Sequence, residues 1–323
     1  MDSGKHPAFK LAEQGIHIRA PRLFDQTSVR AVTDLIAFNT CARYAHFFSE
    51  GRYPTNTPPA VMGSILHRTI KQLHNLYQAK QQQGQSDWIP DEATVKEKFN
   101  VAAEAAHTQG RAMLTREQRE RLERMLCTFH ALEAQWFYPH IQAAEVSLRW
   151  LWEQAPGGPI VLEGQVDVVL LPSEHTSTGI ALWDYKTGKQ PEPGTTEHWS
   201  YERQMKLYAF LYRQCFKQLP QETALYFMQE LAGKPAPTVR PAQALYRMRI
   251  TEEIDDDVLE WLGDVLTRER TCEKRNEWNP PVDPPVRMCR NCGVQWECPA
   301  VRRPYPWEPT STQSDGEDDA FDL

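Results

Sequence analysis

Two β-prone segments that carry acidic residues constrain the fold of this chain more than any other feature. Residues 162–171 and 181–186 are rich in Val, Leu and Trp, and the polar residues 172–179 separate them. Two such runs joined by a polar loop predict an antiparallel hairpin. We expect this hairpin to bring Asp167 and Asp184 across from each other. Two like charges that close are unfavourable unless a cation lies between them.

The second of these segments ends with an acid and a base two residues apart, Asp184 and Lys186. Side chains in a strand alternate between its two faces, so this pair is predicted to project from the same face. A carboxylate beside an ammonium group at a strand end is suited to holding a divalent cation and orienting an attacking water. The same alternation predicts an apolar face and a polar face for the first segment, with Leu162, Val166, Val168 and Leu170 opposite Glu163, Gln165 and Asp167.

The remaining sequence predicts an α+β protein. Helical periodicity is found in residues 28–48, 60–83, 91–107, 115–138, 202–216 and 255–274. Strand-like patterns are found in residues 143–152, 222–229 and 244–250. Three antiparallel-type strands followed by a helix and two more strands favour one sheet with helices packed on it. The helices before residue 140 are dense enough to form a separate lobe or cap.

Several polar residues on these elements have both a functional and a structural interpretation. Gly63 and His67 lie one helical turn apart, and His67 is either a metal ligand or a partly buried histidine bonded to a carbonyl. Gln204 and Tyr208 have the same spacing and either point at a substrate phosphate or base or form an ordinary polar pair. Glu145 is either a further acid near the metal or a surface charge of an edge strand.

The cysteines favour a metal centre over disulfide bonds. There are seven, an odd number, in a chain that looks cytosolic. Cys289, Cys292 and Cys298 are spaced C-x2-C-x5-C and precede a proline, a pattern that can wrap one metal centre. Cys41 is the only other cysteine in a loop-like context and is the candidate fourth ligand. Iron–sulfur, zinc and unrelated thiols remain alternatives, and the other three cysteines are predicted core residues, namely Cys127, Cys215 and Cys272.

Charge and hydropathy limit the possible partners. The net charge of −7 argues against a strongly basic DNA-coating protein, although a local basic groove is still compatible with it. Arg203 and Lys206 favour an anionic ligand, or are solvated charges. No apolar run is long enough to span a bilayer and residues 1–10 lack a signal-peptide core, so we expect a soluble cytoplasmic protein. The acidic residues 311–323 are either a solvated tail or a segment that docks a protein partner.

Taken in order, these residues resemble the PD-(D/E)XK nuclease superfamily. More narrowly, they resemble its RecB-like branch with an iron–sulfur cluster, which includes the AddB nuclease domain and the CRISPR-associated RecB-like exonucleases. The resemblance covers roughly residues 28–300, and Asp184 stands where many relatives have Glu. The motifs that carry it are Cys41, Gly63-x3-His67, Gly164-x2-Asp167, Asp184-x-Lys186, Gln204-x3-Tyr208 and Cys289-x2-Cys292-x5-Cys298.

The resemblance implies a restriction-endonuclease-like core, a mixed central sheet flanked by helices, with an N-terminal helical lobe and a cysteine-clamped region. It implies that one or two Mg²⁺ or Mn²⁺ ions are held by His67, Asp167, Asp184 and the carbonyl of Tyr185. A structural 4Fe–4S cluster, with zinc as the alternative occupant, would be held by Cys41, Cys289, Cys292 and Cys298. The implied division of the chain is an N-terminal segment 1–60, a helical lobe 61–140, a nuclease core 141–279, a cluster-binding segment 280–306 and an acidic disordered tail 307–323.

The function implied by the resemblance is hydrolysis of DNA phosphodiesters by an exonuclease that acts on single strands or DNA ends. Lys186 would steer the attacking water, and Gln204 and Tyr208 would position the strand and stack on a base. Asp167 and Asp184 complete the predicted catalytic set. Partners would be a helicase, recombinase, integrase or single-strand-binding protein in DNA repair, recombination or CRISPR adaptation. The alternative is a non-hydrolytic DNA-binding or interaction subunit of such a complex.

Overall fold

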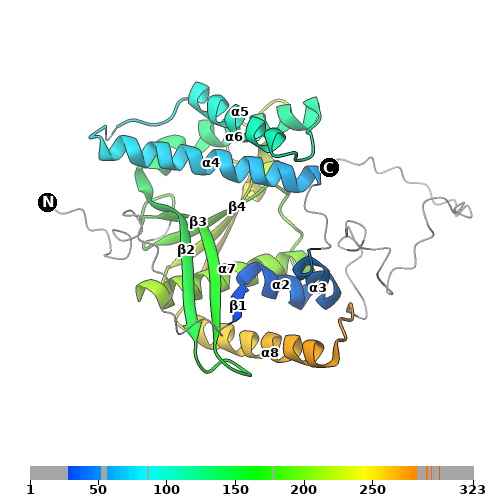
Figure 1. Ribbon diagram of the computed structural model, residues 1–323. Coiled ribbons are helices and arrows are strands. Elements are labelled where there is room, and N and C mark those ends of the chain that lie inside the picture. The colour runs from blue at the N-terminus through cyan, green and yellow to red at the C-terminus, as the bar shows by residue number, and fades with distance from the viewer. Residues whose placement is uncertain are drawn as a thin grey trace, which may run out of the picture.

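The fold is a mixed β-sheet between two layers of helices (Figure 1). The computed structural model describes residues 28–51, 57–85, 87–176 and 178–281, together with Cys289, Cys292 and Cys298. One layer consists of α4 (Pro58–Gln82), α5 (Glu92–Thr108) and α6 (Arg116–Phe137). The other layer consists of α2 (Val32–Thr40), α3 (Ala42–Ser49), α7 (Thr196–Phe216) and α8 (Ile254–Arg275). The predicted α+β class is confirmed.

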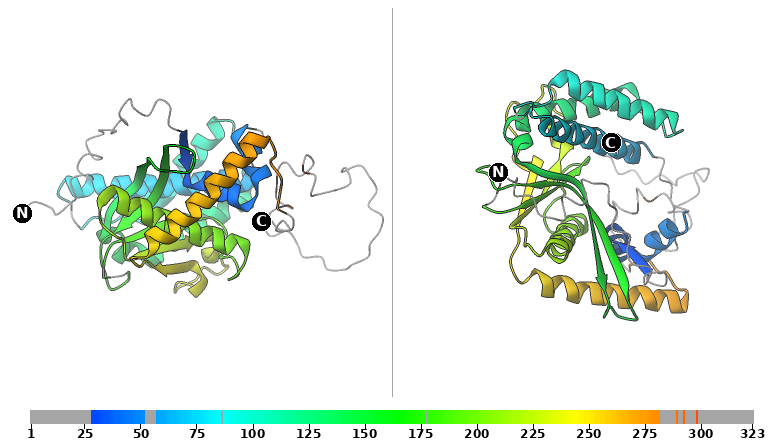
Figure 2. Two further views of the ribbon diagram at one scale, coloured as in Figure 1. Left: turned by 90° about the horizontal axis from the view of Figure 1, so that it is seen from below. Right: turned by 60° about the vertical axis from the view of Figure 1, so that its left-hand side comes forward.

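In the described part of the chain the sheet has six strands. Five of them follow the order β1-β3-β4-β5-β6, and β2 pairs with the other edge of β3. The β3–β4 pair is antiparallel, which confirms the predicted hairpin, whereas β4 and β5 are parallel. β2 and β3 form a long ribbon that extends toward α8 (Figure 2). The strands are β1 (Ser28–Ala31), β2 (Ile141–Trp152), β3 (Ile160–Leu170), β4 (Ala181–Lys186), β5 (Glu222–Phe227) and β6 (Leu245–Arg249).

One edge of β3 changes its partner along the strand. β1 pairs with residues 160–163 in a parallel ladder, and β4 pairs with residues 168–170 in an antiparallel one. Residues 164–167 lie between these two ladders. This stretch of the β3 edge is therefore free of strand pairing, and it lies directly beside the end of β4.

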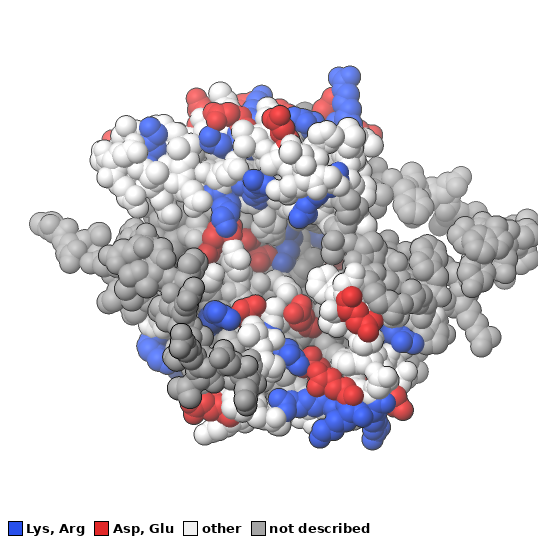
Figure 3. Space-filling view, in the orientation of Figure 1, with Lys and Arg blue, Asp and Glu red and all other residues white. Residues whose placement is uncertain are grey.

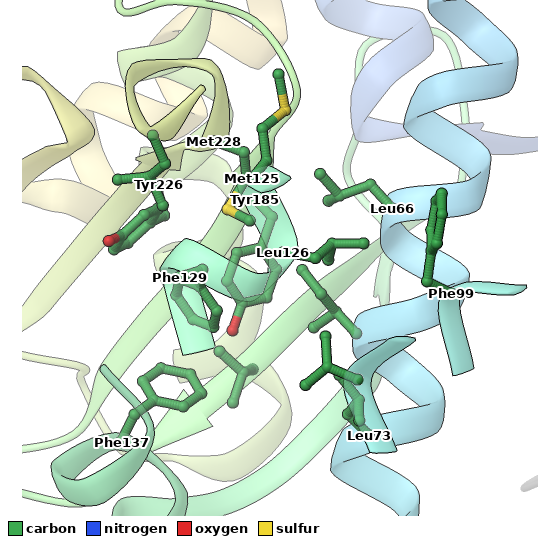
Figure 4. Packing of buried hydrophobic residues seen from close by; sticks show 14 of the residues in the cluster. Leu66, Leu73, Phe99, Met125, Leu126, Phe129, Phe137, Tyr185, Tyr226 and Met228 are labelled. Carbon is green, nitrogen blue, oxygen red and sulfur yellow. The ribbon is translucent and has the colours of Figure 1, made fainter. Parts of the chain in front are cut away.

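Two hydrophobic cores lie on the two faces of the sheet. The core under α2, α7 and α8 includes Leu182 and Leu225, and the core under α4, α5 and α6 includes Trp183 and Tyr185. Figure 4 shows the second core, where side chains from the three helices meet those from the strands. The helices predicted as a lobe thus share one core with the sheet. The predicted domain boundaries themselves remain predictions.

The start of the described chain differs from the prediction. Residues 28–31 have helical spacing in the sequence but form β1, because four residues are too few for periodicity to outweigh pairing with β3. The next helix breaks at Cys41, which is extended between α2 and α3, and its thiol accepts the Tyr44 N–H at 3.5 Å. Cys41 therefore lies in a break, as its loop-like context predicts.

The predicted face alternation of β3 is wrong in one part. Leu162 and Val166 pack in the α7–α8 core, but Val168 and Leu170 pack in the α4–α6 core. The change of face falls at Asp167, where the register places Glu145 of β2 alongside. Glu145 has a φ of 52°, in the left-handed region, which interrupts regular strand geometry at this level.

Three segments treated in the sequence analysis lie wholly or mostly outside the described residues. These are the first 27 residues and the acidic tail 307–323, together with most of the predicted cluster-binding segment 280–306. Among the helices that the structure describes, none combines the length and the apolar character that crossing a membrane requires.

The α4–α6 core makes a prediction about stability. Phe99 of α5 is fully buried, and Figure 4 shows it beside Leu66 of α4. Phe99→Ala should lower the free energy of unfolding by about 3–5 kcal/mol because it leaves a cavity. Urea denaturation followed by circular dichroism measures the change. The matched control, Val101→Ala on the exposed side of the same helix, should stay within about 0.5 kcal/mol of the parent protein, and equal losses would contradict the assignment.

Candidate active site

The predicted acidic residues gather beside the unpaired stretch of the β3 edge. Asp167 ends this stretch, and Asp184 lies near the end of β4. The register that pairs Val168 with Trp183 places the two aspartates at the next position along the hairpin. α4 passes close to the end of β4, since a Cβ on Gly63 would lie 3.7 Å from Thr187 Oγ1. Three elements thus meet around the two carboxylates.

Both oxygens of the Asp167 carboxylate have partners from other elements. Oδ1 lies 3.2 Å from Nδ1 of His67 on α4, and Oδ2 accepts the backbone N–H of Tyr185 at 2.8 Å. A buried carboxylate is stable only when its oxygens are paired in this way. The contacts fix the relative position of α4, β3 and β4, and they place His67 at the site.

Asp184 and Lys186 project from the same face of β4, as their spacing predicts. Nζ of Lys186 lies 2.7 Å from Oδ2 of Asp184. That oxygen is buried and accepts no well-directed hydrogen bond, so the ion pair leaves part of its bonding capacity unused. Lys186 also donates to Oε1 of Gln204 at 2.8 Å, and Nζ lies 5.0 Å from the ring centroid of Tyr201.

Gln204 and Tyr208 of α7 form a buried support behind Lys186. Nε2 of Gln204 donates to the Tyr208 hydroxyl at 2.8 Å while its other amide atom accepts from Lys186. Tyr208 is only 4% exposed and Gln204 only 7%. This burial does not fit the expectation that Tyr208 stacks on a substrate base. In this arrangement the pair orients Lys186, an indirect role that burial permits.

The electrostatics of the site follow from burial and from these contacts. Burial opposes ionisation of Asp167, but the hydrogen bond and charge of His67 outweigh it and hold the Asp167 pKa below its usual value. Burial raises the pKa of Asp184, and the charge of Lys186 opposes this effect. Burial also disfavours the charged form of Lys186, yet the carboxylate of Asp184 raises its pKa. The site therefore keeps an ionised carboxylate and an ammonium group close together.

The donor set fits a hard divalent cation. Carboxylate oxygens are the ligands that Mg²⁺ and Mn²⁺ prefer, and an imidazole nitrogen favours Mn²⁺. The underused oxygen of Asp184 lies beside an ionised Asp167 and its partner His67. In the present arrangement these groups bind one another and Lys186, and no three His, Cys, Asp or Glu side chains of the described segments converge on one point. His67, Asp167 and Asp184 are thus candidate ligands by chemistry and proximity.

A third acid, Glu145, lies next to the site, a position that the sequence alone left open. Its carboxylate pairs with Lys71 of α4 at 3.1 Å and accepts a hydrogen bond from Gln165. Burial raises the pKa of Glu145, and the charge of Asp167 raises it further. The only sequence signal was its place in the predicted strand, since nothing there indicates a left-handed backbone.

The cysteine group can be followed only in part. Burial raises the pKa of the Cys41 thiol. Among the described residues, Cys289, Cys292 and Cys298 included, no three or more His, Cys, Asp or Glu side chains form a group that could hold a metal ion. His46 of α3 stacks on Trp278 with ring centroids 4.6 Å apart, which brings the end of α8 to α3. Most residues around the last three cysteines lie outside the described segments.

Comparisons with known proteins agree with this architecture. A sequence profile of the PD-(D/E)XK nuclease superfamily matches residues 31–299. The crystal structure of a "putative exonuclease" from Eubacterium rectale is similar over 89% of this chain and 96% of its own, with 12% identity and a TM-score of 0.50. A crystal structure of SSO0001 matches over 91% and 93%, with 12% identity and a TM-score of 0.39. No curated protein matches the sequence. The profile match and the first structure support the predicted restriction-endonuclease-like fold.

Gly164, on the unpaired stretch of β3, allows a test of how tightly Tyr208 and Gln204 pack behind Lys186. A Cβ there would lie 2.9 Å from Cε1 of Tyr208, so Gly164→Ala must displace the buried ring that holds Gln204. We expect a loss of about 1–3 kcal/mol in the free energy of unfolding, measured by urea denaturation. Gly188→Ala is the control, because its Cβ would meet nothing within 4 Å. Equal effects of the two substitutions would contradict the tight packing at Gly164.

Proposed function

Because this chain belongs to the PD-(D/E)XK nuclease superfamily, we propose that it is a metal-dependent deoxyribonuclease that hydrolyses phosphodiester bonds. The observation that carries the proposal is the meeting of Asp167, Asp184 and Lys186 beside the unpaired edge of β3. Two acids and an ammonium group from adjacent strands form one compact polar site there. His67 joins them from α4.

In the proposed mechanism some site residues bind the metal ion, and others position the attacking water or Lys186. A divalent cation held by His67, Asp167 and Asp184 would polarise the scissile phosphate and lower the pKa of a bound water. Lys186 offsets the negative charge that grows on the phosphate oxygens, and it orients the attacking water. Gln204 keeps Lys186 in place through a hydrogen bond that does not depend on Asp184.

The backbone of β4 contributes to the same arrangement. The N–H of Tyr185 holds one oxygen of Asp167, while the Tyr185 side chain is anchored in the α4–α6 core. Its carbonyl is the proposed fourth ligand, as the family resemblance implies. An anchored strand end fixes the carboxylates before substrate arrives, which is the condition for efficient electrostatic catalysis.

The finer proposal is an exonuclease that acts on single-stranded DNA or DNA ends. It is supported by the resemblance to RecB-like exonucleases and by the name of the Eubacterium rectale protein, "putative exonuclease". We further propose that it acts with a helicase, recombinase, integrase or single-strand-binding protein in repair, recombination or CRISPR adaptation. The acidic tail is the proposed docking segment, and the cytoplasm is the proposed compartment.

We also propose that Cys41, Cys289, Cys292 and Cys298 hold a structural 4Fe–4S cluster, with zinc as the alternative occupant. The C-x2-C-x5-C spacing of the last three cysteines and the break between helices at Cys41 support this proposal, and thiolates are the ligands that both occupants prefer. The stacking of His46 on Trp278 brings α3, which begins directly after Cys41, next to the residues that follow α8. The cluster would close the protein around the N-terminal helices.

Replacing the central acid tests the nuclease proposal. Asp184→Asn should lower the rate of cleavage of end-labelled single-stranded DNA in Mn²⁺ by about 10³-fold or more, because a neutral amide cannot hold the cation. Gel electrophoresis of the products over time measures the rate and shows whether nucleotides leave from an end. The matched control is Glu163→Gln, which changes a half-buried acid of β3 that pairs with Arg149.

Full activity in Asp184→Asn would contradict the proposal. Normal DNA binding by a wild-type protein that cleaves nothing would instead favour the alternative of a non-hydrolytic binding subunit. The melting temperature of each variant shows whether a loss of cleavage reflects unfolding.

Replacing one thiol tests the cluster proposal. Cys41→Ser should lower the iron and sulfide content of protein purified without oxygen, because one of four ligands is lost. Metal analysis of the wild-type and variant proteins measures the change, and it distinguishes iron from zinc. Cys127→Ser is the control, since this thiol lies on α6 at the edge of the other core. Equal metal content in Cys41→Ser and the wild type would contradict the assignment of Cys41 as a ligand.

A further inference from the structure

α4 presents an exposed polar stripe next to the proposed active site. Ser64, Arg68, Lys71 and Asn75 are all exposed and follow one another at helical spacing. The opposite side of the helix is buried in the α4–α6 core. Figure 3 shows Lys and Arg side chains along the edge of the upper helical layer that faces the hollow of the molecule.

The stripe lies beside the residues through which α4 contacts the site. Gly63 approaches Thr187, and one turn later His67 meets Asp167. One turn further Lys71 pairs with Glu145. Each of these contacts is at, or one residue from, a member of the exposed stripe. The stripe therefore runs next to the face of α4 that contacts Asp167.

The positive charges of the stripe differ in how they are compensated. Lys71 is neutralised by Glu145, as described above. Arg68 forms no ion pair or hydrogen bond with any residue that the structure describes. Arg111, from the connection between α5 and α6, donates to the Ser64 hydroxyl at 2.9 Å, a neutral partner that leaves its charge uncompensated. Two guanidinium groups thus remain available on one side of the site.

The opposite helical layer is arranged differently. Arg203 and Lys206 of α7, which the sequence also favoured as anion contacts, both pair with Asp257 of α8. Arg30 pairs with Glu269 and Glu273 of α8. In a protein with a net charge of −7, a polyanion gains little from the overall field and depends on local uncompensated charge.

We propose that the exposed stripe of α4, with Arg68 and Arg111 as its charged contacts, binds the phosphate backbone of the nucleic acid next to the scissile bond. This inference rests on the proposed nuclease function. Guanidinium groups suit the role because they bind phosphate oxygens with two parallel hydrogen bonds. Such contacts position a strand without reading its sequence. The stripe thereby sets the line along which the strand approaches Asp167 and Asp184.

A binding titration of the full chain tests the proposal. The probe is a fluorescently labelled single-stranded oligonucleotide, measured by anisotropy without divalent metal over a series of NaCl concentrations. Arg68→Ala should weaken binding by about three- to tenfold, and it should reduce the slope of log Kd against log salt by about 0.7, because one phosphate contact is lost. Arg68→Lys should retain most of the slope, since it keeps the charge.

Two controls are built into the structure. Lys71→Ala should lose less affinity than Arg68→Ala, because Glu145 already compensates the lysine. Arg275→Ala removes an exposed arginine from the last turn of α8, in the other helical layer, and should leave both affinity and slope unchanged. Arg68 is exposed and unpaired in the described residues, so its replacement should leave the melting temperature unchanged.

Unchanged affinity and slope in Arg68→Ala would overturn the inference, and so would an equal loss in Arg275→Ala. Failure of the inference and failure of the nuclease proposal give different results. If the wild type cleaves DNA and Arg68→Ala binds normally, the stripe is wrong and the nuclease proposal stands. If the wild type does not cleave but Arg68→Ala binds more weakly, the nuclease proposal fails and the binding surface stands.

Discussion

The buried carboxylate of Asp167 is the constraint on which the site depends. A buried carboxylate is costly unless its oxygens are paired, and here the partners come from two other elements. His67 supplies one from α4, and the backbone of Tyr185 supplies the other from β4. Moving any of the three elements would leave a buried charge unpaired. One side chain therefore couples the helical layer, the β3 edge and the strand end, and the remaining site residues are placed relative to it.

The core beneath the site makes this arrangement rigid. Trp183 and Tyr185 of β4 point into the α4–α6 core, and the alternating residues Asp184 and Lys186 point to the other side. The Tyr185 hydroxyl lies 3.5 Å from Nε2 of His74, whose burial lowers its pKa to about 4 and keeps it neutral. Each polar residue of the strand end is thus followed or preceded by a residue held in the core. A site built on such a strand is held in position without substrate, which electrostatic catalysis requires.

The two-residue alternation of side chains along a strand explains which features of the site the sequence could predict. The hairpin and the shared face of Asp184 and Lys186 follow from local alternation, which the sequence contains directly. The face change in β3 at Asp167 does not, because it accompanies the left-handed backbone of Glu145 on a neighbouring strand. The short strand β1 exists only through its pairing with β3. In the same way Tyr208 looked available for substrate until the packing of α7 buried it. Tertiary contacts decided each of these features.

The difference between local sequence and tertiary contacts also decides which basic side chains are free to bind a phosphate. Arg203 and Arg68 are both arginines on amphipathic helices near site residues, and nothing in their local sequence separates them. The fold pairs Arg203 with Asp257, a residue more than fifty positions later, and gives Arg68 no partner among the described residues. Availability for a phosphate is therefore a property of the folded surface. Ion pairs with α8 compensate Arg203, Lys206 and Arg30, so these three cations are less available to a polyanion. The uncompensated guanidinium groups of Arg68 and Arg111 lie on the side of the sheet from which His67 contacts Asp167.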